Sequence, residues 1–436
     1  MTDSPGGLLR QSLGQRDGSA GCPLPSGQVY VAFSGGSDST ALLLAASRLD
    51  LPQPVIAVHV NHGVHPESNR WSLHCQSIAK TLGVRCRTFD VPGSLLSGRS
   101  DEGTLRKARY QLLEPLLKPG DFLLTAHHLE DVAESVLLAA LRGGSCHELA
   151  GISAQRPLGQ GMLCRPWLTL EKSRLTDLLT EVTLSIIEDP SNNDPKIRRS
   201  FIRQQVLPRV RKSWPNATAL LAATATRQAS AATALNELLD QHLSTENDEV
   251  LESARLDSLS EPTQVLLVQR WLSRHQLPLP TSKNIVQLLK QRKQSAHGRL
   301  PQLQLSGGSV RCYRRNLYLV TSNAVPGRND PAPFQTNWDC VEPLNLPGGL
   351  TITCSTPERF GTLKVQMGPR QQTVQRAGEE GHRQLRKLYQ SLGIPPWVRS
   401  QTPLMFEATQ LIQIGHYWRA QLPKLRDNPL QVRAGQ

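Results

Sequence analysis

The first 150 residues alternate between short apolar runs and longer segments rich in Ala, Leu and charged residues. The apolar runs contain many β-branched and aromatic residues, which favours strands, and the segments between them have the composition of helices. The expected strands are Val29–Phe33, Pro54–Gly63, 84–91 and 121–128, and the expected helices are Thr40–Ser47, Glu67–Gly83, 101–117 and 129–144. This alternation predicts an α/β fold with a doubly wound parallel sheet, which binds ligands beyond the carboxyl ends of its strands.

The pattern changes after Trp214. Segments 216–243 and 261–277 are helical in pattern with no strand between them, and 300–320 has the pattern of a hairpin that turns at Ser306–Gly308. The last hundred residues mix short strands with one basic helix, expected from about Gly381 to Leu392. These changes predict a leader (1–27), the α/β domain (28–213), a mostly helical domain that ends in a hairpin (214–325), and a small α+β domain (326–436).

Composition narrows the class of partner. The formal charge is +13 and the pI is about 9.6, which favours an anionic partner, with nucleic acid the first candidate. The chain starts without a signal-peptide pattern and has no apolar run of membrane-spanning length, so no membrane association is expected. Its eight cysteines form no C-x-x-C pair, which is typical of a reduced cytoplasmic protein and argues against a zinc ribbon or an iron–sulfur cluster.

A glycine- and serine-rich turn follows the first expected strand. The string S-G-G-S-D-S (34–39) separates that strand from a helix, and backbone amides at such a turn converge with the helix dipole on one spot. This arrangement suits phosphate, and Asp38 could reach a magnesium ion bound to it. The alternative is an ordinary turn in which Asp38 or Ser39 caps the helix. The string matches neither the Walker loop nor the dinucleotide motif G-x-G-x-x-G.

Acidic and histidine side chains follow the fourth expected strand, in the string TAHHLEDVAES (125–135). Glu130, Asp131 and Glu134 lie three and four residues apart at the start of a helix, so they share one region of its surface. The alternative is that these acids complement the helix dipole. Two histidines and three acids at the carboxyl end of a strand favour a site.

Basic residues recur in two further segments. Arg106 and Arg109 lie three apart on an expected helix, and Lys196–Lys212 holds seven basic residues and no acid. Both patterns also fit a solvated helix face, but a run of one sign beside a site suggests contact with phosphate. His59, His62 and His65 have no acid or cysteine at metal-ligand spacing. They are expected to line the nucleotide pocket or to bond to the backbone.

Taken together, these motifs resemble a known family. S-G-G-S-D-S resembles the PP-loop of the N-type ATP pyrophosphatases, which cleave ATP to AMP and pyrophosphate. The full set resembles the tRNA(Ile)-lysidine synthetase family over about residues 29 to 418, through HVNHG (59–63), TAHHLEDVAE (125–134), LRGGS (141–145), EDPSN (188–192), RSFIR (199–203) and the segment Arg383–Leu404. Two positions depart from the family pattern: Glu130 replaces the usual Asp, and Ser200 the usual Asn.

The resemblance implies a reaction. ATP adenylates the C2 oxygen of the wobble cytidine in a CAU-anticodon isoleucine tRNA, and the ε-amine of free lysine displaces AMP to give lysidine. The implied cofactors are ATP and Mg²⁺, with the metal at Asp38. The implied catalytic residues are Asp38, Asp131, Glu134, Arg109 and Arg203; the ATP-binding residues are Ser34, Gly35, Gly36, Ser37, Asp38, Ser39, His59 and His127; and the tRNA-binding residues are Arg199, Arg383, Arg386, Lys387 and Arg399.

Three other functions agree less well with the sequence. A tRNA thiolase of the same superfamily generally relies on paired or cluster-binding cysteines, and this chain has no such pair. A glutamine-dependent synthetase needs a glutaminase domain, often with Cys at position two, where this chain has Thr2. A non-catalytic RNA-binding module would be expected to lose part of the loop, Asp38 or the acidic helix, and all are intact. The sequence leaves monomer and homodimer open.

Overall fold

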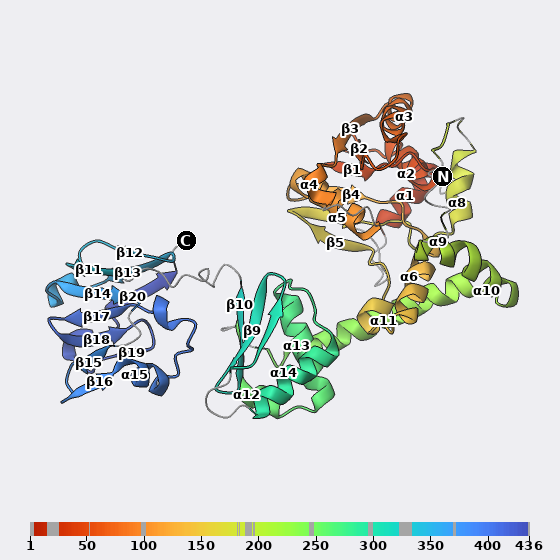
Figure 1. Cartoon of the computed structure of the whole chain (residues 1–436). Coiled ribbons are helices and arrows are strands. Elements are labelled where there is room, and N and C mark those ends of the chain that lie inside the picture. The colour runs from red at the N-terminus through yellow and green to blue at the C-terminus, as the bar shows by residue number, and fades with distance from the viewer. Residues whose placement is uncertain are drawn as a thin grey trace. The chain divides into compact units, whose positions relative to one another are not determined.

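The structure is a computed structural model of the 436-residue chain. It describes residues 4–14, 26–51, 53–96, 102–180, 182, 184–187, 194, 197–243, 248–294, 300–321, 334–368 and 372–434. The chain divides into two compact units, Met1–Leu235 and Asn236–Gln436 (Figure 1). No helix in the described part of the chain is long and apolar enough to cross a membrane.

Unit 1 is built on a six-stranded sheet with the strand order β3-β2-β1-β4-β6-β5. The first five strands of this order are parallel, and β5 pairs antiparallel with β6 at the edge. The strands are β1 (Val29–Ala32), β2 (Ile56–Asn61), β3 (Arg85–Asp90), β4 (Phe122–Leu124), β5 (Gln155–Leu158) and β6 (Gly161–Cys164). The expected parallel sheet is therefore confirmed.

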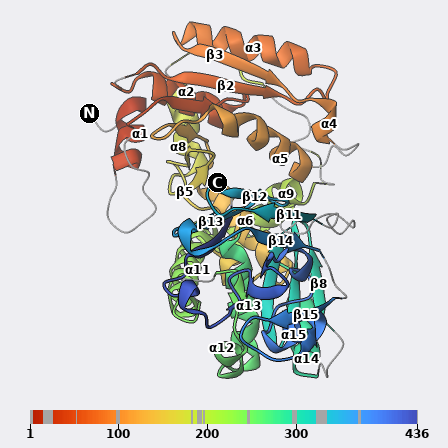
Figure 2. The same cartoon turned by 90° about the vertical axis from the view of Figure 1, so that its left-hand side faces the viewer.

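Helices cover both faces of this sheet. The helices that begin in unit 1 are α1 (Pro5–Gly14), α2 (Ser37–Ser47), α3 (Ser68–Thr81), α4 (Gly93–Leu96), α5 (Glu102–Leu113), α6 (Leu129–Leu141), α7 (Cys146–Leu149), α8 (Lys172–Leu179), α9 (Arg198–Phe201), α10 (Leu207–Ser213) and α11 (Ala217–Asp240). Helices α1, α2, α3 and α8 contribute to one core cluster, and Leu113 of α5 packs with Tyr30 and Leu123 in another. Figure 2 shows α3 and α5 on opposite sides of the strands.

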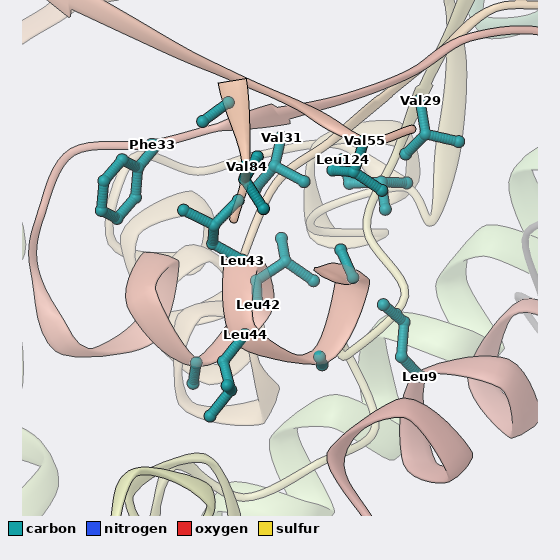
Figure 3. Packing of buried hydrophobic residues seen from close by; sticks show 14 of the residues in the cluster. Leu9, Val29, Val31, Phe33, Leu42, Leu43, Leu44, Val55, Val84 and Leu124 are labelled. Atoms are coloured by element: carbon teal, nitrogen blue, oxygen red, sulfur yellow. The ribbon is translucent and has the colours of Figure 1, made fainter. Parts of the chain in front are cut away.

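Helix α2 is buried along most of its length, which explains its apolar sequence. Its residues from Ser39 to Ala46 are all buried, because α1 and α8 pack on the side that the sheet leaves open. Leu42 and Leu43 pack against Val29 and Val31 of β1 (Figure 3). A helix that is apolar on every side is stable only inside a protein core, so the loop that precedes α2 is held on a rigid base.

Unit 2 begins with helices and a small antiparallel sheet. The helices are α12 (Ser253–Asp257), α13 (Glu261–Arg274) and α14 (Ser282–Gln294), and the sheet has the order β7-β10-β9-β8. Its strands are β7 (Val250–Leu251), β8 (Gln302–Leu305), β9 (Gly308–Tyr313) and β10 (Asn316–Thr321). The hairpin expected at Ser306–Gly308 is confirmed, since Leu305 pairs with Gly308 across the turn and Gly307 has a φ of +93°.

The rest of unit 2 consists mainly of strands. One sheet has the order β11-β14-β17-β18-β15-β16, with β19 (Trp418–Arg419) paired to β18, and a second has the order β12-β13-β20. Their strands are β11 (Phe334–Trp338), β12 (Leu344–Leu346), β13 (Leu350–Cys354), β14 (Leu363–Met367), β15 (Thr373–Arg376), β16 (His382–Gln384), β17 (Leu404–Glu407), β18 (Gln410–Ile414) and β20 (Leu430–Ala434). The finer division into domains at residues 213 and 325 remains a prediction.

The expected basic helix from Gly381 to Leu392 is wrong at its start. Helix α15 covers only Leu385–Ser391, and Arg383 lies on strand β16, where it pairs with Val374 of β15. The apolar spacing was correct, because Leu385 and Leu388 are buried. The error arose because the residues before the first buried leucine are mostly polar, so they show no hydrophobic periodicity that could distinguish a strand from a helix.

Candidate active site

Serine hydroxyls fix the loop between β1 and α2. The Ser39 hydroxyl accepts a hydrogen bond from the Ser34 amide at 3.2 Å and donates one to the Gly36 carbonyl at 3.0 Å. Because α2 begins at Ser37, the amides of Ser37, Asp38 and Ser39 have no carbonyl partner within the helix. These amides and the helix dipole favour an anion at the loop, as the sequence predicts.

Gly35 satisfies two constraints in this loop. Its φ of +81° lies in the left-handed region, which residues with a side chain rarely adopt. A Cβ atom here would also lie 2.5 Å from Ile187 Cδ1 and 3.0 Å from Cys75 Sγ. The Ile187 amide donates to the Gly35 carbonyl at 3.0 Å. Both the conformation and the packing therefore require glycine at position 35.

The second polar segment follows β4, the neighbour of β1 in the sheet. Strand β4 ends at Leu124 and α6 begins at Leu129, so Thr125–His128 connect them at the carboxyl edge. The sheet continues from β1 through β2 and β3 in one direction and through β4 and β6 in the other, so the topological switch point lies between β1 and β4. A ligand site is expected at this place in a doubly wound sheet.

His128 joins the two polar segments. It is 2% exposed, with Nδ1 2.9 Å from Glu130 Oε2 and Nε2 3.5 Å from Asp131 Oδ2 and 3.7 Å from Asp38 Oδ2. Burial opposes its protonation, but the nearby carboxylates of Asp38 and Glu130 outweigh burial and raise the pKa of His128 to about 9. His128 is therefore a cation at neutral pH, held among three carboxylates.

Asp38 is ionised in this environment. Burial favours its neutral form, but the interaction with His128 and the charge of Lys172 outweigh burial and hold the pKa of Asp38 below its usual range. Lys172 Nζ lies 3.9 Å from Asp38 Oδ2. The side chain of Asp38 is 30% exposed, so a bound ligand can reach it.

Glu134 is enclosed by two arginines. It is 0% exposed; Arg203 Nε donates to its Oε1 at 2.6 Å, and Arg199 Nε donates to its Oε2 at 2.9 Å. Both arginines also donate through Nη2 to Asp131 Oδ1 at 3.2 Å. Glu134 is expected from the sequence to be catalytic; in the structure both of its oxygens accept hydrogen bonds from these arginines, and it is not among the residues that line the cavity.

A π-helical turn presents these arginines. Arg199 belongs to α9 and Arg203 to the π-helical turn Ile202–Val206, which leads into α10. The arginines are four residues apart, so they project from one face. Pro208 has no amide hydrogen for the helical hydrogen-bond pattern, and an interruption of this kind accounts for the wider turn before it.

Three histidines near the site are held neutral by burial. His59 is buried, and because its Nδ1 lies 2.9 Å from the Phe33 carbonyl, Nδ1 carries the hydrogen and Nε2 is an acceptor. Burial lowers the pKa of His59, and it lowers that of His127 to about 3. Burial and the charge of Arg109, whose Nη2 lies 3.3 Å from His62 Nε2, lower the pKa of His62 to about 4.

Most of the expected site residues of unit 1 line one cavity of about 660 Å³. They are Ser34, Gly36, Ser37, Asp38, Ser39, His59, Arg109, His127, Asp131, Arg199 and Arg203. Gly35 and Glu134 lie beside the cavity without lining it. The described lining includes no cysteine. The motif 188–192 and Lys196 lie outside the described residues.

Four of the expected tRNA-binding residues lie in unit 2. Arg383, Arg386 and Lys387 are exposed. Arg399 instead makes contacts within its own unit: Nε donates to the Ile394 carbonyl at 2.9 Å. This hydrogen bond holds the Arg399 side chain in its observed position without a ligand.

Sequence reasoning missed two charged side chains at the site. His128 could have been found from its place directly before a helix that carries Asp131 three residues later, since the Asp131 carboxylate accepts from the His128 amide at 3.0 Å. Lys172 lines the cavity from the start of α8, and its amide donates to Glu130 Oε2 at 3.0 Å. No motif in the sequence marked this lysine.

Three family models match successive parts of the chain. Residues 13–210 match the family described as "PP-loop domain", residues 251–318 the "TilS substrate binding domain" and residues 363–432 the "TilS substrate C-terminal domain". A solved structure titled "U34-tRNA thiolase NcsA from Methanococcus maripaludis with its [4Fe-4S] cluster" aligns with a TM-score of 0.41 and 17% identity, over 51% of this chain and 77% of that chain.

Similarity to curated proteins extends over nearly the whole chain. The tRNA(Ile)-lysidine synthase of Methylococcus capsulatus is 35% identical over 90% of this chain and 92% of that protein. The tRNA(Ile)-lysidine synthase of Coxiella burnetii is 33% identical over 89% of this chain and 88% of that protein. The chain therefore belongs to the tRNA(Ile)-lysidine synthase family.

Proposed function

We propose that this chain uses ATP with Mg²⁺ to activate the wobble cytidine of a CAU-anticodon tRNA(Ile) and then joins free lysine to it. Family membership supports ATP-dependent formation of lysidine on tRNA(Ile). The observation that carries the proposal is the single cavity in which the PP-loop, Asp38, Asp131 and the two arginines Arg199 and Arg203 meet.

The first step is adenylation. The C2 oxygen of cytidine attacks the α-phosphorus of ATP, and the bond to the β-phosphate breaks to release pyrophosphate. The amides at the start of α2 would hold the pyrophosphate end, and Lys172 would offset its charge. His59 Nε2, an acceptor in the cavity wall, would receive a hydrogen bond from the adenine amino group.

A magnesium ion fits this site through one protein ligand. Among the described residues, no group of three or more His, Cys, Asp or Glu side chains could hold a metal ion. Magnesium in phosphate sites usually takes one or two carboxylates together with phosphate oxygens and water. Asp38 supplies one partly exposed carboxylate beside the loop, so it would hold the ion together with ATP, and the ion would offset charge on the phosphates.

The second step forms lysidine. The ε-amine of lysine, after losing a proton, attacks C2; the C2–O bond breaks, and AMP leaves with the oxygen. The ammonium has a reference pKa of about 10.4 and needs an acidic environment that binds it and takes its proton. Asp131 lines the cavity and would serve as this acid, whereas Glu134, which does not line the cavity, would position Arg199 and Arg203. These arginines and Arg109 would stabilise phosphate or the lysine carboxylate.

A labelling experiment tests the proposal. The purified chain is incubated with ATP, MgCl₂, radiolabelled lysine and an unmodified CAU-anticodon tRNA(Ile), and label is measured in the tRNA together with AMP. We expect stoichiometric label and AMP, and neither product in EDTA. Formation of AMP without incorporation of lysine at any lysine concentration would refute lysine as the second substrate.

A further inference from the structure

Three arginines from different elements converge on the ring of Tyr110. The guanidinium carbon of Arg156, on β5, lies 4.7 Å from the ring centroid, and that of Arg106, on α5, lies 5.3 Å from it. Arg165 follows β6 directly, and its positive charge interacts with the Tyr110 phenol. We call Arg106, Arg156 and Arg165 the arginine cluster.

The arginine cluster lacks a carboxylate partner among the side chains that the structure describes. The ion pairs in the described part of unit 1 involve other cations: Arg70, His128, Lys172, Arg199, Arg203 and Arg211. Arg165 is 3% exposed; its Nη1 donates to the Ser153 carbonyl at 2.6 Å, and its Nε is buried without a hydrogen-bond partner. A buried cation without a counter-ion is unusual in a folded protein.

The positive charges of the cluster are close together. Because Arg106 and Arg156 both contact one ring at 5.3 Å and 4.7 Å, their guanidinium carbons lie at most about 10 Å apart. Burial raises the pKa of the Tyr110 phenol, but the charges of Arg106 and Arg165, with smaller contributions from Arg109 and Arg156, outweigh burial and lower it. The positive charges of the three arginines repel one another, and an anion bound between the guanidinium groups would relieve this repulsion.

The position of the cluster indicates which anion it binds. Tyr110 lines the cavity, whereas Arg106, Arg156 and Arg165 are not among its lining residues. Strand β5 forms the edge of the sheet, so Arg156 is reached from outside the cavity. The loop proposed for the ATP phosphates lies before α2, and α2 and α5 pack in different core clusters. The anion is therefore a group attached to a ligand that enters the cavity past Tyr110.

We propose that the arginine cluster binds a backbone phosphate of the RNA beside the nucleotide that enters the cavity. Guanidinium groups match phosphate through paired hydrogen bonds, and phosphate contacts fix the position of an RNA without reading its sequence. Held in this way, the cytidine is oriented toward the α-phosphate of ATP. The inference rests on the proposed function, since it assumes an RNA substrate at this cavity. The carboxylate of lysine is also an anion that guanidinium groups bind through paired hydrogen bonds, and the experiment distinguishes it from an RNA phosphate.

The experiment measures binding of a CAU-anticodon stem-loop RNA and of full-length tRNA to the full chain at several KCl concentrations, without ATP or lysine. Arg156→Gln and Arg106→Gln should each weaken binding and reduce the slope of log affinity against log salt by about 0.7 to 0.9, the loss of one phosphate contact. Arg156→Lys keeps the charge and should retain most of the slope.

Arg87→Gln is the matched control. Arg87 lies on β3, the opposite edge strand, and its guanidinium carbon is 5.3 Å from the Phe89 ring. It is therefore also a stacked arginine, and among the described residues no second arginine or lysine stacks on that ring. Its slope should equal that of the unmodified chain. Thermal melts establish that each variant is folded. The test uses the partly exposed Arg156 and Arg106 rather than the buried Arg165, because substitution of a buried residue can unfold the chain.

Two outcomes overturn the inference. If Arg156→Gln and Arg106→Gln bind RNA with the slope of the Arg87→Gln control, the cluster makes no phosphate contact. If the RNA slope is unchanged while the KM for lysine rises at least tenfold, the cluster binds the lysine carboxylate instead. Neither result touches the proposed function, which is tested separately by formation of lysidine in the unmodified chain.

Discussion

Arg203 holds Glu134 through two parallel hydrogen bonds, from Nε to Oε1 at 2.6 Å and from Nη2 to Oε2 at 2.9 Å. Such a paired contact fixes both the distance and the plane of the guanidinium group. Burial opposes the charged form of Arg203, but the bond with Glu134 outweighs burial and raises the pKa of Arg203. Glu134 therefore fixes the orientation of two arginines that line the cavity, and it does not itself line the cavity.

Removal of this carboxylate should cost both stability and activity. In Glu134→Gln, Arg199 and Arg203 lose their buried counter-charge, and we expect unfolding to become easier by about 3 kcal/mol, near the low end for a broken buried pair. The low end applies because the Arg203 side chain is 38% exposed. Urea unfolding measures this change, and lysidine formation should fall with it.

The matched control for this change is Glu114→Gln, an exposed acid in the same unit, which should leave stability unaltered. The double variant Glu134→Gln/Arg203→Gln should recover part of the lost stability, because it removes an arginine left without its partner. A double variant that is less stable by the full sum of the two single changes would show that Glu134 and Arg203 do not act as a pair.

Asp38→Asn should reduce AMP release by about 10²- to 10³-fold, because it removes a preorganised charge at the proposed pyrophosphate and magnesium site. Binding of tRNA without ATP should remain unchanged. Single-turnover AMP formation is the measurement, and Asp50→Asn, at an exposed position after α2, is the control. An Asp38→Asn enzyme within a few-fold of the unmodified rate would remove Asp38 from the reaction.

The fold of unit 1 follows from periodicities that are local in the sequence. The runs that begin at Val29, Pro54, Val84 and Asp121 became β1, β2, β3 and β4, because β-branched residues next to helical segments specify a buried parallel sheet. The hairpin of β5 and β6 was not predicted. Its strands have four residues each and carry a proline and a glycine, so too few positions remain to define a period.

The sequence could predict only those parts of the site whose residues lie close together within one short motif. The PP-loop and Asp131 were located because their chemistry is contained in neighbouring residues. The pairing of Glu134 with Arg199 and Arg203 spans 65 to 69 positions and depends on how α6 packs beside α9. The sequence showed that these charges exist, but their mutual contacts are a property of the packing, so the sequence did not reveal that arginines occupy both oxygens of Glu134.

His62 makes stability depend on pH. Its pKa is lowered to about 4 in the folded chain, by burial first and by Arg109 second, so between that value and about 6.5 the unfolded chain binds more protons. Stability is therefore fully present above pH 6.5 and is lost as the pH falls toward 4. Urea unfolding between pH 7.5 and 5 should show a shallower pH dependence in His62→Gln than in the unmodified chain. Equal pH dependence in the two proteins would contradict this role.

The exposed basic residues of unit 2 give the last prediction. Arg386 and Lys387 lie on α15, whose Leu385 and Leu388 are buried, while Arg383 lies on β16 with its Nη2 3.3 Å from Glu379 Oε2. If Arg386 and Lys387 contact the acceptor stem of tRNA, Arg386→Ala/Lys387→Ala should raise the KM for full-length tRNA and flatten its salt dependence. Turnover at saturating tRNA should change little.

Arg383→Ala is the internal control for that pair. Its charge is already offset by Glu379, so its loss should affect the KM less than the loss of Arg386 and Lys387. An anticodon stem-loop lacks the acceptor stem, so its reaction, measured beside the full tRNA at two salt concentrations, should be the same in all variants. A thermal melt checks that each variant is folded. An unchanged KM and salt slope in the folded double variant would make α15 an ordinary solvated face, and the acceptor stem would then have to be bound by other residues.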